Sequence, residues 1–204
     1  MNPKEIIFQF HELWYNMSDF TWNNMTWMGV QCYKNPMDMW IVQELIAEIR
    51  PYAIIETGTF QGGSALFYAH ITDLLNLDSK ILTIDINGRT FLPKHPKITY
   101  LAYPSESQEC FDKCREILVM ETREEKILLI LDSDHTTDHV YKELSLYSKL
   151  NPAYIIVEDT NMTGPADAVT MFLAENNNYV VDRCREKFLF TFNPGGFLRR
   201  KQYK

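Results

Sequence analysis

The chain has 204 residues, a length that suits one domain built around a single hydrophobic core. Hydrophobic residues make up 46% and charged residues 23%, the proportions of an ordinary folded domain, which argues against extensive disorder. The formal net charge of −7 argues against a general binder of nucleic acids or anionic membranes, because such proteins present a basic face.

The first fifty residues are predicted to be mainly helical, with helices over residues 5–17 and 38–50. All four tryptophans lie within the first 40 residues. We therefore divide the chain into an N-terminal helical and aromatic cover, residues 1–50, and a second domain, residues 51–204. The aromatic side chains are expected to pack on the sheet or on a subunit partner. Alternatively, Trp22, Trp27 and Tyr33 help to wall the pocket that binds a substrate.

The start of the sequence lacks the basic segment and apolar run of a signal peptide. The four cysteines form no C-x-x-C pair, so neither a disulfide scaffold nor a zinc site is indicated. The longest apolar stretch, residues 127–131, is much shorter than a membrane span. These features predict a cytoplasmic protein with reduced thiols.

From Pro51 onward, predicted strands alternate with helices or loops. Two further strands, residues 179–181 and 188–192, are separated only by a short polar stretch and should form an antiparallel hairpin. The pattern predicts an α/β fold with a doubly wound, mostly parallel seven-stranded sheet, a C-terminal antiparallel hairpin and an N-terminal helical extension. The first five strands are expected at residues 53–55, 81–84, 98–101, 127–131 and 154–157, and the helices at 64–74, 105 or 107 to 118, 138–147 and 166–175.

The turn after the first of these strands reads ETGTFQGGS over residues 56–64. Gly58 permits a tight turn and the close approach of a ligand. The spacing is not G-x-G-x-x-G, so the dinucleotide fingerprint fails. Glu56 suits a ligand with a cationic part, and Asp85, at the end of the next strand, can accept the two hydroxyls of a ribose. These features favour S-adenosylmethionine over NAD, with a purely structural glycine turn as the alternative.

Acidic residues also end the fourth and fifth strands. Asp132 and Glu158 are one strand–helix–strand step apart, so in a parallel sheet they become neighbours and converge with Asp159. Three oxygen donors of this kind suit Mg²⁺ or Mn²⁺. The alternative is that Asp159 only caps the segment that follows it.

His135 follows the fourth strand, three residues beyond Asp132. An imidazole beside a bound divalent ion is well suited to act as a general base near neutral pH. His139 is the second candidate for this role. A surface or capping histidine is the alternative interpretation of His135.

The stretch from Trp27 to Gly196 resembles the cephalosporin hydroxylase and rhamnosyl O-methyltransferase family of S-adenosylmethionine-dependent enzymes. The E-x-G-x-x-x-G-x-S pattern is more distantly similar to the catechol and caffeoyl-CoA O-methyltransferases. The segments that carry the resemblance are residues 50–51, 55–65, 85–86, 131–135, 157–161 and 191–196.

The resemblance implies a Rossmann-like class I methyltransferase domain over residues 51–204. It implies a Mg-dependent O-methyltransferase that acts on a hydroxyl of a sugar or of a glycosylated natural product. His135 would match the base, acting with Asp132, and Asp132, Glu158 and Asp159 would match the metal ligands. The expected cofactor-binding positions are Glu56, Gly58, Thr59, Phe60, Gly62, Gly63, Ser64, Asp85, Ser105 and Asp132.

Two positions depart from the related patterns. The segment before Ser105 is Ala-Tyr-Pro instead of the small Gly-Ser type. Thr136 and Thr137 stand where the catechol enzymes have a lysine base. The rival functions are an NAD-dependent oxidoreductase and a non-catalytic scaffold that binds S-adenosylmethionine. A homo-oligomer, a dimer or higher, is the expected assembly.

Overall fold

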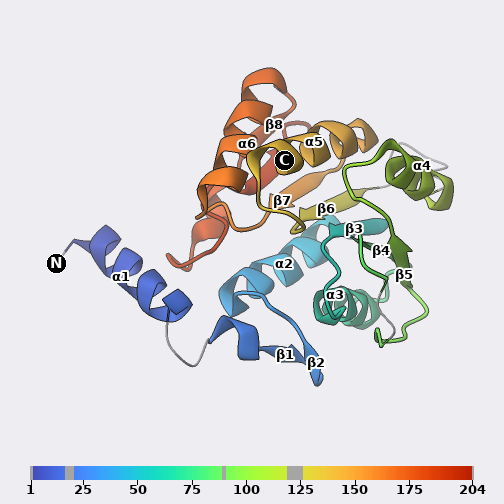
Figure 1. The fold of residues 1–204 in the computed structure, drawn as a ribbon, viewed down its shortest axis with the longest axis horizontal. Helices are drawn as coiled ribbons and strands as arrows, with labels where there is room; N and C mark the ends of the chain where they lie inside the picture. Colours follow the sequence, from blue (N-terminus) through green and yellow to red (C-terminus); the bar gives the residue numbers. More distant parts are fainter. Residues whose placement is uncertain (1, 17–20, 89–90, 119–125, 204) are drawn as a thin grey trace.

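A seven-stranded sheet in the order β5-β4-β3-β6-β7-β9-β8 forms the centre of the computed structural model (Figure 1). The structure describes residues 2–16, 21–88, 91–118 and 126–203. Neighbours among β3 to β7 pair in parallel, whereas β9 runs antiparallel to both β7 and β8. The predicted doubly wound, mostly parallel sheet is thereby confirmed. Its strands are β3 (Ala53–Thr57), β4 (Lys80–Asp85), β5 (Ile98–Ala102), β6 (Ile127–Leu131), β7 (Tyr154–Val157), β8 (Tyr179–Val181) and β9 (Phe197–Arg200).

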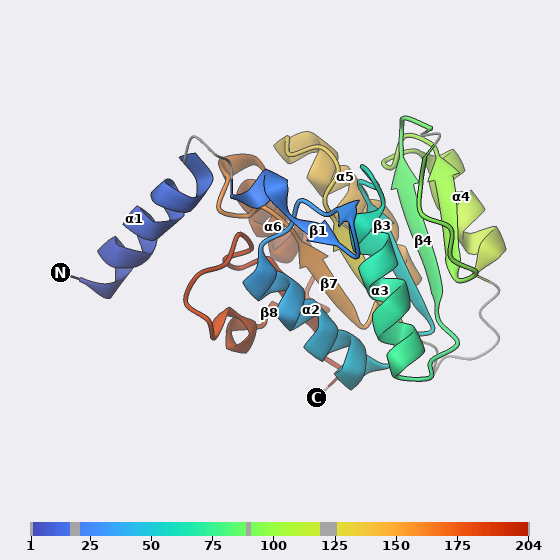
Figure 2. The same ribbon diagram turned by 90° about the horizontal axis from the view of Figure 1, so that it is seen from below.

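Helices cover both faces of the sheet (Figures 1 and 2). Successive strand residues point to opposite faces, so Ile54 and Ile55 enter two different cores. Ile54 packs in the core formed with α2 (Pro36–Ile49) and α3 (Gly63–Leu74). Ile55 packs in the core formed with α4 (Gln108–Ile117), α5 (Thr137–Tyr147) and α6 (Thr163–Glu175).

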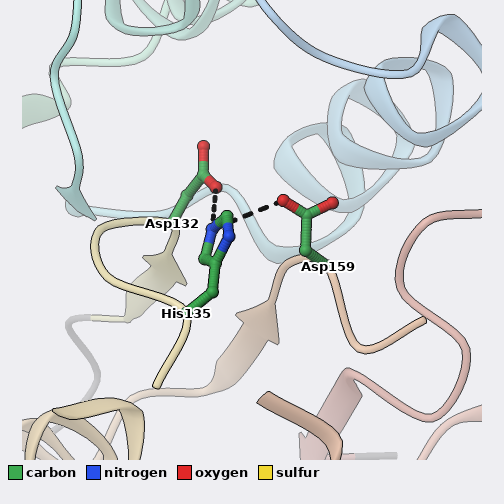
Figure 3. A group of neighbouring side chains, drawn as sticks. All are labelled: Asp132, His135 and Asp159. Carbon is green, nitrogen blue, oxygen red and sulfur yellow. Dashed lines mark hydrogen bonds and ion pairs between the residues drawn. The ribbon is translucent and has the colours of Figure 1, made fainter. Parts of the chain in front are cut away.

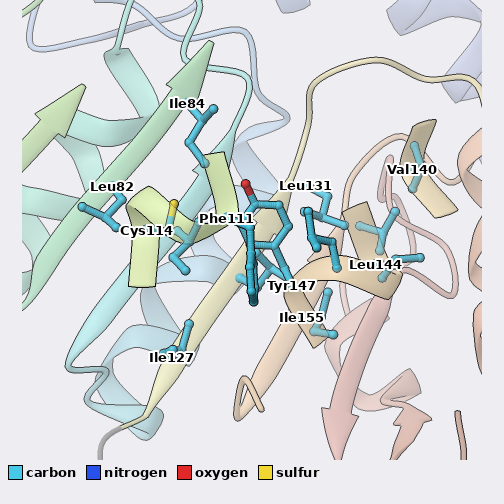
Figure 4. Packing of buried hydrophobic residues seen from close by; sticks show 14 of the residues in the cluster. Leu82, Ile84, Phe111, Cys114, Ile127, Leu131, Val140, Leu144, Tyr147 and Ile155 are labelled. Carbon is cyan, nitrogen blue, oxygen red and sulfur yellow. The ribbon is translucent and has the colours of Figure 1, made fainter. Parts of the chain in front are cut away.

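The second of these cores is dense with large side chains. Leu82 and Ile155 from the sheet meet Phe111, Leu144 and Tyr147 from the helices (Figure 4). Each of these side chains is almost completely withdrawn from solvent, and burial of this kind contributes about 1.5–3 kcal/mol per large side chain. The core therefore holds the strand ends, and the residues that follow them, in fixed positions.

The ends of the helices are set by local capping. Asn35 accepts a hydrogen bond from the Met37 amide and Pro36 opens α2, so this helix begins two residues before the predicted start. Ser107, one of the two predicted starts, caps α4 by accepting a hydrogen bond from the Cys110 amide. Gly62 precedes α3, which begins one residue before the predicted start at residue 64.

The prediction of a strand over residues 188–192 is wrong. These residues form a loop after the short 3₁₀ helix η3 (Arg183–Glu186), and the antiparallel partner of β8 is β9, which follows the 193–196 turn. Two apolar side chains of the loop, Phe190 and Phe192, pack against aromatic rings of α1 (Pro3–Asn16). The Phe192 amide donates to the Asp38 carboxylate, so it has a partner outside any strand.

The N-terminal segment is partly integrated with the sheet. Helix α1 stands at the side of the molecule, next to the loop that holds Phe190 (Figure 2). A small antiparallel pair, β1 (Thr26–Trp27) and β2 (Val30–Gln31), packs near α3. Helix α2 belongs to the same core as β3 and β6, and the domain boundary at residue 50 stays a prediction.

Two further observations concern membrane-spanning helices and cysteines. Within the described residues, no helix combines the length and the apolar character needed to cross a membrane. Each of the four cysteines, all of them in described segments, is a free thiol.

Candidate active site

The acidic residues that follow the parallel strands meet at one edge of the sheet. The Asp132 amide donates to the Thr57 carbonyl at 3.0 Å, and the Glu158 amide donates to the Leu131 carbonyl at 3.0 Å. These bonds continue the parallel ladders by one residue, so the side chains after β6 and β7 are placed by the sheet itself. Of the three predicted metal ligands, Asp132 and Asp159 fall in one cluster of possible ligand atoms, whereas Glu158 is not part of that cluster.

Asp132, His135 and Asp159 form a compact cluster of possible metal ligands (Figure 3). The His135 Nε2 lies 3.4 Å from Asp132 Oδ1 and 3.4 Å from Asp159 Oδ2. One ligand atom from each residue lies within 4.8 Å of the others. The carboxylate oxygens suit Mg²⁺ or Mn²⁺, and the imidazole nitrogen beside them can serve either as a further ligand or as a base.

Lys34 is the charged residue of the site that the sequence analysis missed. Its Nζ donates to Asp132 Oδ2 at 2.5 Å and to Glu158 Oε2 at 2.6 Å. Only 5% of the Lys34 side chain is exposed, so this is a buried cation between two acids. Nothing in the local pattern around Lys34 signals this contact, because the partners lie far along the chain.

The pKa values of the three acids shift in different directions, because burial and the neighbouring charges act against each other. Burial would raise the pKa of Asp132, but the Lys34 ammonium and His135 hold that pKa below its usual value. Burial raises the pKa of Glu158 well above its ordinary value, despite the charge of Lys34. Burial and the neighbouring Asp132 raise the pKa of Asp159 to about 6. The site thus combines an ionised acid with two that hold protons more readily.

The pKa values of the two basic residues, Lys34 and His135, are raised, so both hold their protons more readily. For Lys34, the attraction of Asp132 and Glu158 outweighs the effect of burial, and its pKa rises well above the ordinary value. The hydrogen bond to Asp132 raises the pKa of His135, with burial acting against it. Without a bound metal, His135 therefore holds a proton more readily than a free imidazole.

The glycine turn is shaped by close contacts. Gly58 has φ +91, and a β-carbon there would lie 1.8 Å from the Asp132 carbonyl oxygen. A β-carbon on Gly63 would lie 2.2 Å from the Gln31 carbonyl oxygen. Gly58 therefore allows β3 to turn against the strand-end acid, whereas Gly63 allows α3 to pack against the N-terminal segment.

Glu56 lies behind this turn, fully buried. Its Oε2 accepts a hydrogen bond from Thr83 Oγ1 at 2.7 Å, and the Thr83 hydroxyl also lies 2.8 Å from Thr59 Oγ1. Burial raises the pKa of Glu56. Glu56 and Thr59 thus act in this structure as internal supports of the turn.

Two cavities meet at the turn. One, of about 330 Å³, contains the acidic cluster, and the other, of about 410 Å³, lies toward β4 and β5. Gly58, Asp85 and Ser133 line both of them. Asp85 accepts hydrogen bonds from the Phe60 amide at 3.0 Å and from the Asn87 amide at 2.9 Å, which fixes its carboxylate between the two cavities.

Ser105 and His139 belong to the second cavity. The Ser105 hydroxyl lies 3.1 Å from His139 Nε2, and the Ser133 hydroxyl lies 3.0 Å from the same nitrogen. Ser133 also donates to the buried carboxylate of Glu143 at 2.8 Å. The structure therefore separates the two candidate bases: His135 lies with the acidic cluster, and His139 lies with Ser105.

The predicted cofactor-binding residues divide into two groups. Gly58, Phe60, Asp85, Ser105 and Asp132 line the cavities. The other predicted positions line neither of these two cavities; they are Glu56, Thr59, Gly62, Gly63 and Ser64.

Aromatic side chains wall the first cavity. Trp22 and Tyr33 line it, and the Tyr33 ring lies 4.5 Å from the Phe60 ring, centroid to centroid. Trp27 is placed elsewhere: its ring packs 4.7 Å from Phe67 and its Nε1 donates to His70 at 3.0 Å. Tyr15 and Phe192 complete the aromatic lining.

The strand order β5-β4-β3-β6-β7-β9-β8, with an antiparallel β9 and acids at the parallel strand ends, defines a class I methyltransferase fold. Solved structures agree. A structure described as the CmcI-N160 apo-structure has a TM-score of 0.70 at 20% identity and covers 90% of this chain and 78% of that chain. Another, described as CmcI-D160 Mg-SAM, has a TM-score of 0.68 at 18% identity and covers 93% and 83%.

The sequence comparisons identify the family. The family model described as Rhamnosyl O-methyltransferase/CmcI matches residues 19–201. The rhamnosyl O-methyltransferase of Mycobacterium leprae is 35% identical over 215 residues, covering 98% of this chain and 93% of that protein. The protein of the same name from Mycobacterium tuberculosis is 32% identical, covering 97% and 86%. The chain belongs to the rhamnosyl O-methyltransferase/CmcI family, and the resemblance found in the sequence is confirmed.

Proposed function

We propose that this chain transfers a methyl group from S-adenosylmethionine to a hydroxyl of a sugar or of a glycosylated small molecule. The observation that supports this most directly is the cluster of Asp132, His135 and Asp159 in a cavity that borders a second one. The relatives named rhamnosyl O-methyltransferases support a sugar hydroxyl as the acceptor.

The second cavity fits an adenosine. Asp85 would accept the ribose hydroxyls, and Ser105 and His139 offer polar groups for the edge of a base. Gly58 lines both cavities, so the remainder of the cofactor would extend past it from the second cavity toward Asp132 in the first. S-adenosylmethionine supplies an electrophilic methyl group on a cationic sulfur, which suits an acidic site.

The donor set of the first cavity fits Mg²⁺ or Mn²⁺. Asp132 and Asp159 would hold the ion together with Glu158, which lies at the same strand end. Three neighbouring carboxylates, one buried and two partly exposed, repel one another, so a divalent cation would stabilise the arrangement. When bound, such an ion makes a nearby hydroxyl more acidic and supplies positive charge for the alkoxide that forms.

His135 would accept the proton of the acceptor hydroxyl at Nε2. Asp132 orients this ring and stabilises its charged form. The acceptor oxygen then gains the methyl group as the bond from carbon to sulfur breaks. Trp22 and Tyr33 would hold the apolar face of the sugar ring and limit access of water. A cytoplasmic location and a homo-oligomeric state stay predictions of the sequence.

The test is a methylation assay with the purified protein, S-adenosylmethionine, Mg²⁺ and a panel of rhamnosides and other glycosides. Mass spectrometry detects a methylated product, and chromatography detects S-adenosylhomocysteine. We expect both with at least one glycoside, and neither with the Asp132→Asn protein. Binding of NADH, with no binding of S-adenosylmethionine by calorimetry, would contradict the proposal.

A further inference from the structure

Lys34 reaches the candidate active site from the N-terminal segment, and its backbone is held there from both sides. Asn35, the next residue, caps α2, and Pro36 is the first residue of that helix. On the other side, Gln31 and Cys32 pack against Gly63 at the start of α3, with Cys32 buried. The Lys34 side chain is therefore directed at the strand ends by two helices.

Lys34 contacts only one of the two carboxylate oxygens of Asp132. Lys34 bonds Asp132 Oδ2, whereas Asp132 Oδ1 faces His135. Glu158 is bonded to Lys34 through Oε2. Lys34 thus binds two of the three predicted metal-ligand acids, and at Asp132 it uses the oxygen that does not face His135. The ligand atoms of Asp132, His135 and Asp159 remain close together in its presence.

The positive charge of Lys34 reduces the repulsion between the neighbouring acids. Asp132, Glu158 and Asp159 lie together and are largely withdrawn from water, so their mutual repulsion favours protonation or separation. A buried lysine between two of them opposes that repulsion. Replacing all members of a buried ion pair by packed apolar side chains often costs no stability, so stability alone does not account for Lys34.

We propose that Lys34 is a positioning residue for the metal site: it holds Asp132 and Glu158 in place when no divalent ion is bound, and its positive charge weakens the binding of that ion. The inference rests on the proposed function, because it presupposes a divalent ion at these acids. It adds a residue from outside the predicted methyltransferase domain to the machinery of the site.

Lys34→Met removes the charge and keeps most of the side-chain length, and Lys34→Arg keeps the charge. Lys97→Met is the control, because Lys97 is partly buried and pairs with Asp73 at 2.6 Å, away from the site. The measurements are the melting temperature in EDTA and in excess Mn²⁺, and Mn²⁺ affinity by electron paramagnetic resonance. Neither measurement depends on turnover.

We expect Lys34→Met to melt at a lower temperature than wild type in EDTA and to recover in Mn²⁺. Its metal-induced rise in melting temperature should be about twice that of wild type, and its Mn²⁺ affinity about tenfold higher. Lys34→Arg should resemble wild type in both measurements. Lys97→Met should be destabilised equally with and without metal, since its ion pair does not touch the site.

An equal metal-induced shift and equal Mn²⁺ affinity in wild type and Lys34→Met would overturn the inference and leave the proposed metal site intact. No metal-induced shift in wild type would instead overturn the metal site of the proposed function. If Lys34→Met does not fold in EDTA, refolding is attempted in Mn²⁺. Recovery only with Mn²⁺ supports the inference, and failure in both conditions contradicts it.

Discussion

Gly58 and Asp132 touch through their backbones: a β-carbon on Gly58 would lie 1.8 Å from the Asp132 carbonyl oxygen. The same Gly58 has φ +91, which L side chains rarely adopt. The glycine turn and the acid after β6 are therefore one rigid unit, and the position of the carboxylate depends on the absence of a side chain at residue 58.

Gly58→Ala should lower the free energy of unfolding by at least about 2 kcal/mol and abolish cofactor binding, because the methyl group strains the backbone and displaces Asp132. Gly29→Ala is the control for the backbone strain alone. Gly29 has φ +83, and an added β-carbon there meets no described atom within 4 Å. Urea unfolding and calorimetry with S-adenosylhomocysteine measure the two effects. Equal losses in both variants would mean that the contact with Asp132 is unimportant.

His135→Ala should lower kcat by about 10²-fold or more, because it removes the proposed proton acceptor. Its affinity for S-adenosylhomocysteine should stay near that of wild type, since His135 lies with the acids and not with Ser105. His139→Ala should instead lower the affinity for S-adenosylhomocysteine, because His139 contacts Ser105 and Ser133 in the second cavity. Unchanged turnover of His135→Ala would refute its assignment as the base.

EDTA should abolish methyl transfer, and added Mg²⁺ or Mn²⁺ should restore it, because the donor oxygens of the site suit these ions. The readout is formation of S-adenosylhomocysteine before and after the metal is returned. Asp159→Asn should need more added metal than wild type for half-maximal activity. Full activity in EDTA would exclude a required divalent ion.

Trp22→Ala and Tyr33→Ala should raise the KM of the acceptor and leave the KM of S-adenosylmethionine nearly unchanged, because both rings line the first cavity. Trp27→Ala is the control: Trp27 is a neighbouring tryptophan that packs on Phe67 and His70 instead. Steady-state kinetics with both substrates separate these effects. A larger change in the KM of S-adenosylmethionine than in that of the acceptor would mean that these rings bind the cofactor, and would contradict the prediction.

Asp38 should make stability depend on pH. Burial raises the pKa of Asp38 from 3.8 to about 6, against hydrogen bonds from Thr191 and the Phe192 amide. The folded state therefore binds a proton that the unfolded state releases, so the stability that Asp38 contributes is largest below pH 3.8 and is lost as the pH rises to about 6. Asp38→Asn should not show this loss, and its unfolding free energy should gain about 2.4 kcal/mol on wild type between pH 4 and 7. Urea titrations of both proteins at each pH give this difference; a constant difference would contradict the shift.

The sequence predicted the features that depend on parallel-strand geometry. Strand ends in such a sheet face one edge, so the meeting of Asp132 with Asp159 could be anticipated from their positions after apolar runs. Lys34 could not, because its contacts join distant parts of the chain through a loop. Residues 188–192 have the composition of a strand, but their aromatic rings pack on α1, and that choice depends on tertiary packing.

Glu56 shows a different limit of sequence reasoning. An acid before a glycine turn suggested contact with a cationic ligand. In the folded chain the Glu56 side chain points to Thr83 on the adjacent strand, where the register of β3 and β4 pairs these two residues. The direction of one side chain at a strand end depends on this pairing, which the pattern of residues 56–64 does not contain.

The route by which Lys34 enters the site has a consequence for chimeras between relatives. Exchanging residues 51–204 alone would combine the carboxylates of one protein with the lysine-bearing segment of another. Gly63 would then also meet a foreign backbone at Gln31. A transplantable unit must carry residues 31–36 together with the strand ends, so the smallest exchangeable piece of this fold is discontinuous along the sequence.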